Sequence, residues 1–283
     1  MFLRKVIIKV DDVELKDFKI TFEVEKYLHG TPNKANVKIW NLKKSSRDQI
    51  EEKGKKVEIL AGYEDTETGL VYSGDIVNVV HTKTQTEWVT EILSGDGIDI
   101  LGGSIVNQTM AAGSSMNQVY DALVARMPGI SKGVTKGIKN CLSGKKSLLR
   151  SLQLTGDVKS WLDQIAKDCG FEYSVNENII ETNPTGQPLS DLPPIQVNQA
   201  KGMKNSPKKT EKGVNVKTIL NPNLKLARTI DITDTGKEIP KGTGSFEEVP
   251  GTIDQGVYRI VKIVHRGSTH ENTWESEIES DTF

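Results

Sequence analysis

Residues 57–97, VEILAGYEDTETGLVYSGDIVNVVHTKTQTEWVTEILSGDG, decide the fold of this chain. Hydrophobic and polar residues alternate in three successive runs, which polar turns containing glycine separate. A period of two residues is typical of a half-buried β-strand, because successive side chains point to opposite faces of a sheet. Gly74 lies inside the second run, where it predicts a β-bulge or a close approach of another backbone. The stretch therefore predicts three consecutive antiparallel strands that act as scaffold, with no row of reactive side chains.

The same alternation covers most of the first hundred residues. Residues 6–10, 18–25 and 35–39 each carry a hydrophobic side chain at every second position, with polar turns between them. One short helix is predicted among these strands, because Ser46 and Gln49 have the spacing of a capping box. About six short strands and one helix favour a small barrel or sandwich.

The composition changes at about residue 101. Between Met116 and Met127, and again between Val158 and Cys169, hydrophobic residues recur at helical spacing, so residues 101–183 are predicted to form a small α/β insert. Residues 184–212 are rich in proline and lysine without an apolar period, which indicates a linker. The alternation then returns, and residues 213–283 are predicted to form a second β region.

The overall composition is that of an ordinary soluble protein. The 283 residues are 27% charged and 36% hydrophobic, with a formal net charge of −1. This balance gives no general reason to expect binding to nucleic acid or to an anionic membrane. No apolar run approaches the ~20 residues of a membrane-spanning helix. The first ten residues, MFLRKVIIKV, are interpreted as a strand and not as a signal peptide, because charged residues interrupt the apolar ones.

The two cysteines, Cys141 and Cys169, are interpreted as free thiols. They are too few and too far apart in the sequence for a disulfide framework or a zinc site, which favours assembly in a reducing compartment. Cys169 completes the apolar face of the second predicted helix. A buried structural thiol is therefore favoured over a catalytic nucleophile.

The sequence contains no complete nucleotide-binding or calcium-binding motif. Gly144-Lys145-Lys146-Ser147 has lysine where a P-loop requires other residues, and Gly242-Thr243-Gly244 opens no helix. Asp96-Gly97-Ile98-Asp99 lacks the further oxygen ligands of a calcium loop and is interpreted as a turn.

The histidines and carboxylates do not form a metal site or a catalytic pair in the sequence pattern either. His265 and His270, with Glu271, bracket a turn, but zinc needs a third or fourth well-placed ligand, so we interpret the two histidines as polar residues at a hairpin tip. Four carboxylates are interpreted as surface residues of strands and not as an acid/base pair: Asp75, Glu87, Glu91 and Asp96. We therefore predict no catalytic, cofactor-binding or metal-binding residue, and no enzymatic activity.

Basic residues are concentrated between Arg126 and Arg150. No acidic residue lies between Asp121 and Asp157, whereas seven basic ones do: Arg126, Lys132, Lys136, Lys139, Lys145, Lys146 and Arg150. A solvated loop is the simpler interpretation. The alternative is a docking surface for an acidic partner, such as the run Glu271, Glu275, Glu277 and Glu279 of a neighbouring copy.

Several stretches together resemble the baseplate hub proteins of tailed phages, of the late-control protein D type, a family related to contractile injection systems. They occur in the family's order and cover both β regions and the insert. One departure is Lys225-Leu226-Ala227-Arg228, which stands where a Pro-Gly turn is expected. The matching stretches are NVKIWNL (36–42), VEILAGY (57–63), VYSGDI (71–76), WVTEILSGDG (88–97), VKSWLDQIAKDCGFEYSV (158–175), GVNVKTILNPNL (213–224) and GVYRIVKIVHRGSTHENTWESEI (256–278).

The resemblance implies a mainly β (α+β) structural protein with two tube-like β-barrel domains, at 1–100 and 213–283, flanking the α/β insert. Such hubs assemble as trimers, join a hexameric tail tube to a trimeric spike and contact other baseplate proteins. DNA passes through their channel as cargo. The resemblance places the protein in the virion tail baseplate, assembled in the host cytoplasm, without cofactors and without membrane insertion by this chain.

Two other functions remain open from the sequence. A tail-tube or tube-initiator protein would form sixfold rings instead of threefold ones. A cell-wall-degrading enzyme associated with the tail is disfavoured, because residues 101–184 are too few and too poor in acid/base candidates to form a lytic domain.

Overall fold

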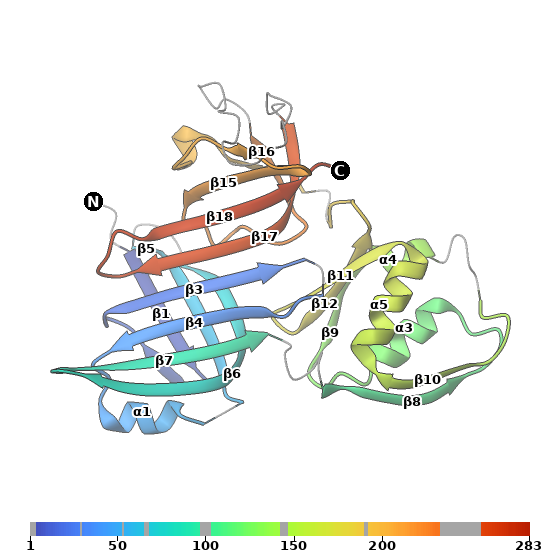
Figure 1. The fold of residues 1–283 in the computed structure, drawn as a ribbon, viewed down its shortest axis with the longest axis horizontal. Helices are drawn as coiled ribbons and strands as arrows, with labels where there is room; N and C mark the ends of the chain where they lie inside the picture. Colours follow the sequence, from blue (N-terminus) through green and yellow to red (C-terminus); the bar gives the residue numbers. More distant parts are fainter. Residues whose placement is uncertain are drawn as a thin grey trace. The chain divides into compact units, whose positions relative to one another are not determined.

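The computed structural model describes residues 4–28, 30–52, 54–64, 68–96, 103–141, 147–189, 192–232 and 256–283. Contacts divide the chain into two compact units. Unit 1 comprises Met1–Lys26, Lys34–Gly95 and Ser190–Phe283, and unit 2 comprises Tyr27–Asn33 and Asp96–Leu189. Strands predominate over helices (Figure 1), so the prediction of a mainly β protein is confirmed. The described part of the chain contains no helix of the length and apolar character needed to span a membrane.

Unit 1 is built on one large sheet to which both ends of the chain contribute. Its hydrogen-bonded order is β14-β15-β18-β17-β3-β4-β7-β6-β5-β1-β2, with β16 paired to β17 and β13. In Figure 1 the red strands β17 and β18 continue directly into the blue strands β3 and β4. The strands are β1 (Arg4–Val10), β2 (Val13–Leu15), β3 (Ile20–Tyr27), β4 (Asn33–Trp40), β5 (Lys56–Tyr63), β6 (Gly69–Thr84), β7 (Glu87–Asp96), β13 (Ile195–Gln196), β14 (Lys208–Lys209), β15 (Gly213–Ile219), β16 (Thr229–Ile232), β17 (Gly256–Ser268) and β18 (Trp274–Asp281).

The sheet is open: along this order its two end strands, β14 and β2, are not paired with each other in the described residues. No closed barrel is therefore found within the described part of one chain. The predicted boundaries of the two β domains and the linker stay a prediction. Two short strands, β13 and β14, and the 3₁₀ helix Gln199–Lys201 lie within the range predicted as linker.

The alternation in residues 57–97 predicts the strands correctly. Val57, Ile59 and Ala61 are fully buried in β5, where they join the hydrophobic core of unit 1. At Gly74 another backbone approaches closely, as one of the two predicted alternatives states. A Cβ there would lie 3.0 Å from the carbonyl oxygen of Gly95 and would clash with the Tyr72 hydroxyl.

The short helix α1 (Lys44–Ile50) exists, but its predicted cap does not. The N-cap is Lys43, which makes no side-chain capping bond. Ser46 lies inside the first turn, so the predicted capping box with Gln49 is wrong. The helix is held by burial of Ile50 instead.

Within its described residues, unit 2 packs the helices α3 (Met116–Val124), α4 (Lys136–Cys141) and α5 (Val158–Cys169) with two small sheets. Both longer helices begin at a side-chain cap: Ser115 forms a capping box with Gln118, and Asp157 accepts a hydrogen bond from the Ser160 amide. The small sheets are β8 (Ile105–Met110) with β10 (Leu152–Asp157), and β9 (Ser131–Thr135), β11 (Phe171–Asn176) and β12 (Ile179–Pro184) in the order β11-β12-β9.

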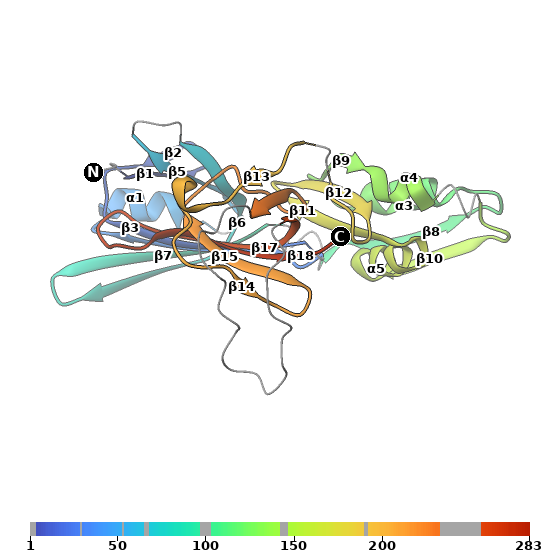
Figure 2. The same cartoon turned by 90° about the horizontal axis from the view of Figure 1, so that it is seen from above.

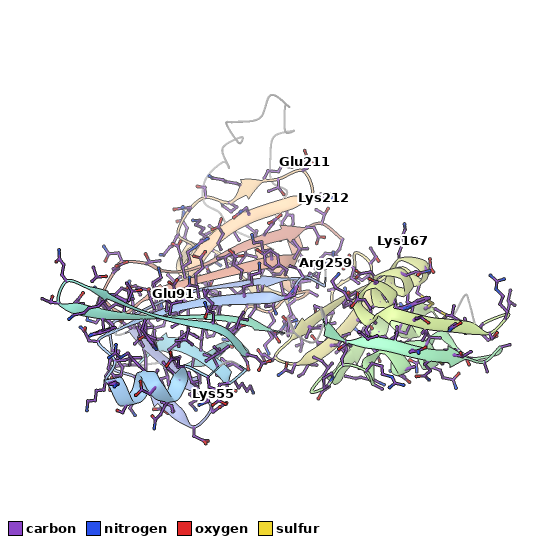
Figure 3. The ribbon with its side chains drawn as sticks, turned by 60° about the horizontal axis from the view of Figure 1, so that its bottom comes forward. Lys55, Glu91, Lys167, Glu211, Lys212 and Arg259 are labelled. Carbon is purple, nitrogen blue, oxygen red and sulfur yellow. A yellow bond between two sulfur atoms is a disulfide. The ribbon has the colours of Figure 1, made fainter. Side chains whose placement is uncertain are left out.

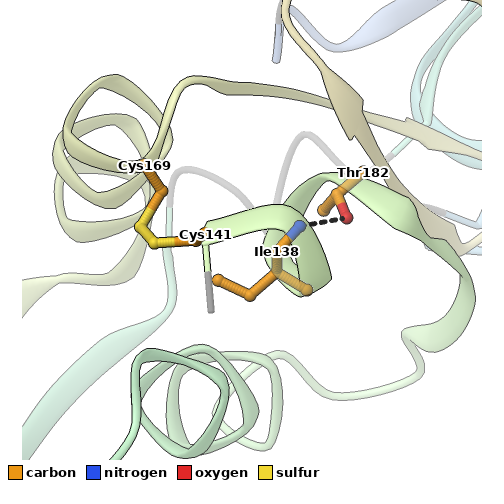
Figure 4. Close-up of a disulfide and its surroundings, with 4 residues drawn as sticks. All are labelled: Ile138, Cys141, Cys169 and Thr182. Atoms are coloured by element: carbon orange, nitrogen blue, oxygen red, sulfur yellow. Dashed lines mark hydrogen bonds between the residues drawn. A yellow bond between two sulfur atoms is a disulfide. The ribbon is translucent and has the colours of Figure 1, made fainter. Parts of the chain in front are cut away.

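The prediction of free thiols is wrong. Cys141, at the end of α4, and Cys169, at the end of α5, form a disulfide with their Cα atoms 4.8 Å apart (Figure 4). Although the two cysteines are 28 positions apart in the sequence, the packing of α4 on α5 brings the two helix ends together.

Candidate assembly surface

One face of the unit 1 sheet is polar, and we call it the polar face. It lies opposite the hydrophobic core, because the side chains of each strand alternate between the two faces. The cross-strand pairs Lys217↔Glu277 and Arg266↔Glu275 place side chains of three strands, β15, β17 and β18, on this one face. The polar face comprises Glu23, Asn36, Lys38, Glu91, Lys204, Asn215, Lys217, Arg266, Glu275 and Glu277.

A ladder of ion pairs crosses the C-terminal half of this face. Glu275 lies 3.1 Å from Lys204 Nζ and 3.6 Å from Lys217 Nζ, and Lys217 also lies 3.5 Å from Glu277. Arg266 then donates to Glu277 at 2.9 Å and to Glu23 of β3 at 3.0 Å. The ladder therefore joins the C-terminal strands to the N-terminal ones.

The ladder shifts the pKa values of its members in consistent directions. For Glu275, partial burial raises the pKa, but the hydrogen bond and charge of Lys204 lower it more, so the net shift is downward. Glu277 behaves in the same way through Arg266 and Lys217. The pKa of Arg266 is raised: burial lowers it, and the two glutamates more than offset this.

A second group of polar contacts lies on strands β4 and β7. Asn36 donates to Glu91 at 2.8 Å, and Lys38 lies 3.5 Å from the same carboxylate. Glu91 is labelled on β7 in Figure 3. Together with the ladder, these contacts give Lys38, Lys204, Lys217 and Arg266 a carboxylate within salt-bridge distance.

An aromatic cluster beneath the polar face holds together the strands that carry this face. The Trp274 ring meets Phe22 edge-on at 6.2 Å and Tyr63 at 5.9 Å between centroids, and the Arg4 guanidinium lies 5.4 Å from the same ring. A Cβ at Gly267 would lie 3.1 Å from Trp274 and closer still to Phe22, so only glycine fits there. Strands from both ends of the chain thus share one core.

The last strand pair carries a partly buried ion pair as well. Arg259 is almost fully buried, and its guanidinium binds both carboxylate oxygens of Asp281, at 3.0 and 2.6 Å. A bidentate pair of this kind fixes the geometry of both partners. It anchors the end of β18 to β17.

One stretch of strand edge in unit 1 has no neighbouring strand among the described residues. β5 pairs with β6 only as far as Asp75, whereas β7 pairs with β6 up to Thr84. We call residues Val77–Thr84 the β6 edge. Val80 is 41% exposed there, and Leu93 on the paired strand is 37% exposed. Figure 2 shows the β6–β7 hairpin extending beyond the other strands of unit 1.

A family model described as "Baseplate hub gp41" matches residues 3–235 of the sequence. The chain belongs to the baseplate hub gp41 family. The resemblance that the sequence suggests is therefore confirmed, and this hub protein is a structural component of a phage tail baseplate.

Three solved structures share the fold of the hub protein over nearly its whole length. The 43 kDa tail protein of prophage MuSo2 from Shewanella oneidensis is 9% identical, with a TM-score of 0.67 and coverage of 99% of this chain and 97% of that one. A tail protein from Neisseria meningitidis MC58 is 10% identical, with a TM-score of 0.67 and coverage of 98% and 96%. At these identities the similarity concerns the fold alone.

The third structure is E. coli c3393, a component of the type VI secretion system that is itself described as similar to the T4 tail proteins gp27 and gp5. It is 12% identical, with a TM-score of 0.62 and coverage of 98% of this chain and 76% of that one. The sequence of the hub protein matches none of the curated proteins with which it was compared.

His265 and His270 have separate environments. His265 is fully buried in β17 and bonds Ser276 Oγ at 2.8 Å through Nδ1, so its placement at a hairpin tip is wrong. His270 is exposed at the tip, 2.8 Å from Thr269 Oγ1. The described residues contain no group of three or more histidines, cysteines or carboxylates placed to hold a metal ion.

Asp96 is not the surface carboxylate that was predicted. It is 1% exposed and accepts hydrogen bonds from Asn33 Nδ2 at 3.2 Å and from the Glu177 amide at 2.8 Å. It thereby holds the turn between β11 and β12. Residues 97–99, 144–146 and 242–244 lie outside the described residues.

The described part of the basic stretch offers less free charge than the sequence suggests. Lys132 Nζ lies 2.6 Å from Asp121, whereas Lys145 and Lys146 lie outside the described residues. Glu275 and Glu277 of the acidic run have cationic partners within their own chain. Docking of this run onto the basic stretch stays a hypothesis.

Unit 1 also contains a cleft of about 460 Å³. The polar side chains that line it include Tyr63, Gln196 and Lys201.

Proposed function

We propose that three copies of this protein form the hub ring that joins a hexameric tail tube to a trimeric spike and lines the channel between them. Residues 1–100 and 213–283 act as two tube-like domains, so a trimer presents six such domains to a sixfold tube. Residues 101–183 form the insert between them, and 184–212 form the linker. The continuous sheet that β17 and β3 create supports this reading, because both β regions then offer one shared surface.

The ion-pair ladder is the observation that favours the polar face as the channel wall. Unpaired lysine and arginine side chains bind DNA phosphates and release counterions, which would hold the DNA in place. On the polar face, Lys204, Lys217 and Arg266 are engaged by carboxylates of the same chain. A wall of this kind stays wetted and nearly neutral, so DNA passes as cargo without binding.

The β6 edge supports contact between copies. An unpaired strand edge presents N–H and C=O groups that a second chain satisfies by adding a strand. Head-to-tail contacts close into a ring when the rotation between subunits allows it. Exposed Val80 adds an apolar contact to this edge.

The partners are then further copies of this chain, the tail tube, the spike and other baseplate proteins. The site of action is the virion tail, after assembly in the host cytoplasm, and the chain acts without catalysis, cofactor or insertion into a membrane.

Native mass spectrometry of the purified full-length protein tests the assembly. We expect a particle of three copies. Six copies would favour a tube-initiator protein instead, and a monomer at all concentrations would contradict ring formation. Clearing of cell-wall material in zymography would contradict a purely structural role.

The contribution of the β6 edge can be tested at Lys83. In the two-residue hairpin Gln85-Thr86, Thr84 and Glu87 form the hydrogen-bonded pair, so the Lys83 N–H points away from β7. Lys83→Pro removes this donor and should prevent trimer formation, whereas the control Lys83→Ala keeps it and should assemble normally. Equal assembly of both variants would exclude this edge as the contact.

A further inference from the structure

The helix α4 is held in unit 2 mainly by its neighbours. Its six residues are too few for a stable helix on their own. Gly137 packs so closely that a Cβ would lie 2.7 Å from Phe171 and 2.9 Å from the Asn183 backbone. Ile138 is fully buried and donates its amide to Thr182 Oγ1 at 3.3 Å (Figure 4). The position of α4 therefore depends on tertiary contacts.

The Cys141–Cys169 disulfide is the covalent tie between α4 and α5. It closes a loop that contains β10 and nearly all of α5. In the chain-entropy account, a cross-link across 28 residues lowers the entropy of the unfolded chain substantially. The free energy of unfolding of unit 2 is thus expected to be larger in the oxidised state than in the reduced state.

We propose that Cys141 and Cys169 form a redox-sensitive lock, which is open as two thiols in a reducing compartment and closed by oxidation once the protein leaves it. The oxidant is a small-molecule disulfide. Its S–S bond breaks as the Cys141–Cys169 bond forms, two electrons pass to it from the cysteines, and two protons end on the released thiols. The proposal does not depend on the trimeric assembly.

The two sulfurs differ in access, which sets the order of the exchange. Cys141 is 6% exposed and belongs to the hydrophobic core of unit 2, whereas Cys169 is half-buried at the end of α5. Thiol–disulfide exchange requires approach of the external molecule to a sulfur atom. Cys169 therefore forms the mixed disulfide, and Cys141 displaces the small thiol from it.

Single-cysteine variants of the full-length protein test this order with oxidised glutathione as the probe. Cys141→Ser should accumulate a glutathione adduct on Cys169, detected by peptide mass spectrometry. Cys169→Ser should form an adduct on Cys141 at least about tenfold more slowly, because of its burial. Equal rates, or faster reaction at Cys141, would overturn the assigned order.

Limited trypsin digestion tests the lock itself. Lys139 is exposed within α4, and cleavage after it requires α4 to unfold locally. Reduction of the wild-type protein should speed this cleavage by up to about 400-fold, the factor that the loop-closure entropy of a 28-residue cross-link gives in full. The double variant Cys141→Ala/Cys169→Ala is the control for the reductant. Its rate of cleavage after Lys139 should be the same with and without the reductant.

Two results would overturn the lock. One is an equal rate of cleavage after Lys139 in the oxidised and reduced wild-type proteins. The other is the presence of two free thiols, counted by alkylation, after incubation of the reduced protein with excess oxidised glutathione. Both measurements can be made whether or not the protein assembles into trimers. A failure of the lock can therefore be told apart from a failure of trimer assembly.

Discussion

The Nε atom of Arg266 lies 3.0 Å from Oε1 of Glu23, so an arginine in the second-last strand of the chain pairs with a glutamate 243 residues earlier. The same guanidinium also donates to Glu277 at 2.9 Å. Arg266 thus links strands β3, β17 and β18 on the polar face. The two β regions meet at this residue.

Replacing Arg266 should have a small effect on stability. Arg266→Gln removes both ion pairs, but these side chains are partly exposed, at 32% for Arg266 and 46% for Glu23, so solvent screens the interaction. We expect a loss of less than about 1 kcal/mol in the free energy of unfolding, measured by urea denaturation. A loss of several kcal/mol would show that the pair is shielded more than its exposure indicates.

Replacing the partner glutamate, Glu277, should raise the affinity of the protein for DNA. Glu277→Gln leaves Arg266 and Lys217 with one carboxylate fewer, and should raise the affinity of the protein for double-stranded DNA at low salt. Filter binding or fluorescence anisotropy measures this, with Arg266→Gln as the matched variant that should not bind more tightly. Unchanged affinity in Glu277→Gln would contradict a role of the ladder in masking cations.

Acid should destabilise the fold through His265. Burial lowers its pKa from 6.5 to about 3, with a smaller contribution from the charge of Lys26. Because the folded pKa lies below the unfolded one, the unfolded state binds the proton first. The contribution is therefore fully present above pH 6.5 and is lost as the pH falls towards 3.

Urea denaturation at several pH values measures this effect. Between pH 6.5 and about pH 5 the wild-type protein should lose about 2 kcal/mol that a His265→Gln variant does not lose. His270→Gln, which changes an exposed histidine only two residues beyond the end of β17, serves as the control and should follow the wild type. An identical pH dependence of all three proteins would refute the assignment.

Gly267→Ala should destabilise unit 1 by steric overlap. The new Cβ would enter the space that Phe22 and Trp274 occupy, and overpacking of this kind costs about 1–3 kcal/mol. Gly103→Ala is a suitable control, because a Cβ at Gly103 meets no atom within 4 Å. Thermal unfolding should show a lower midpoint for Gly267→Ala alone.

Local patterns predicted the strands and two of the helices well. The alternation around Val57 and Ile59 reflects burial of one face, and the caps at Ser115 and Asp157 follow from side-chain hydrogen bonds within one turn. These features depend on neighbours in the sequence. The local sequence therefore contains the information that specifies these strands and helices.

Features that depend on distant residues were not predictable in the same way. The pairing of β17 with β3, the burial of His265 and the Cys141–Cys169 bond each require tertiary packing that no local pattern encodes. Ala227 is an instructive case, because it adopts φ 57° in a turn where a Pro-Gly sequence was expected. Its amide bonds to the Ile260 carbonyl at 2.9 Å, and this contact supports a backbone conformation that alanine by itself disfavours.

The adjacency of β3 and β17 also constrains biosynthesis. A ribosome completes β3 long before it reaches β17, so the strand edge of the nascent chain has no intramolecular neighbour during most of translation. Contacts so distant in sequence slow folding and prolong exposure to aggregation. Truncated products that end before residue 256 should consequently be recovered as insoluble or chaperone-bound material.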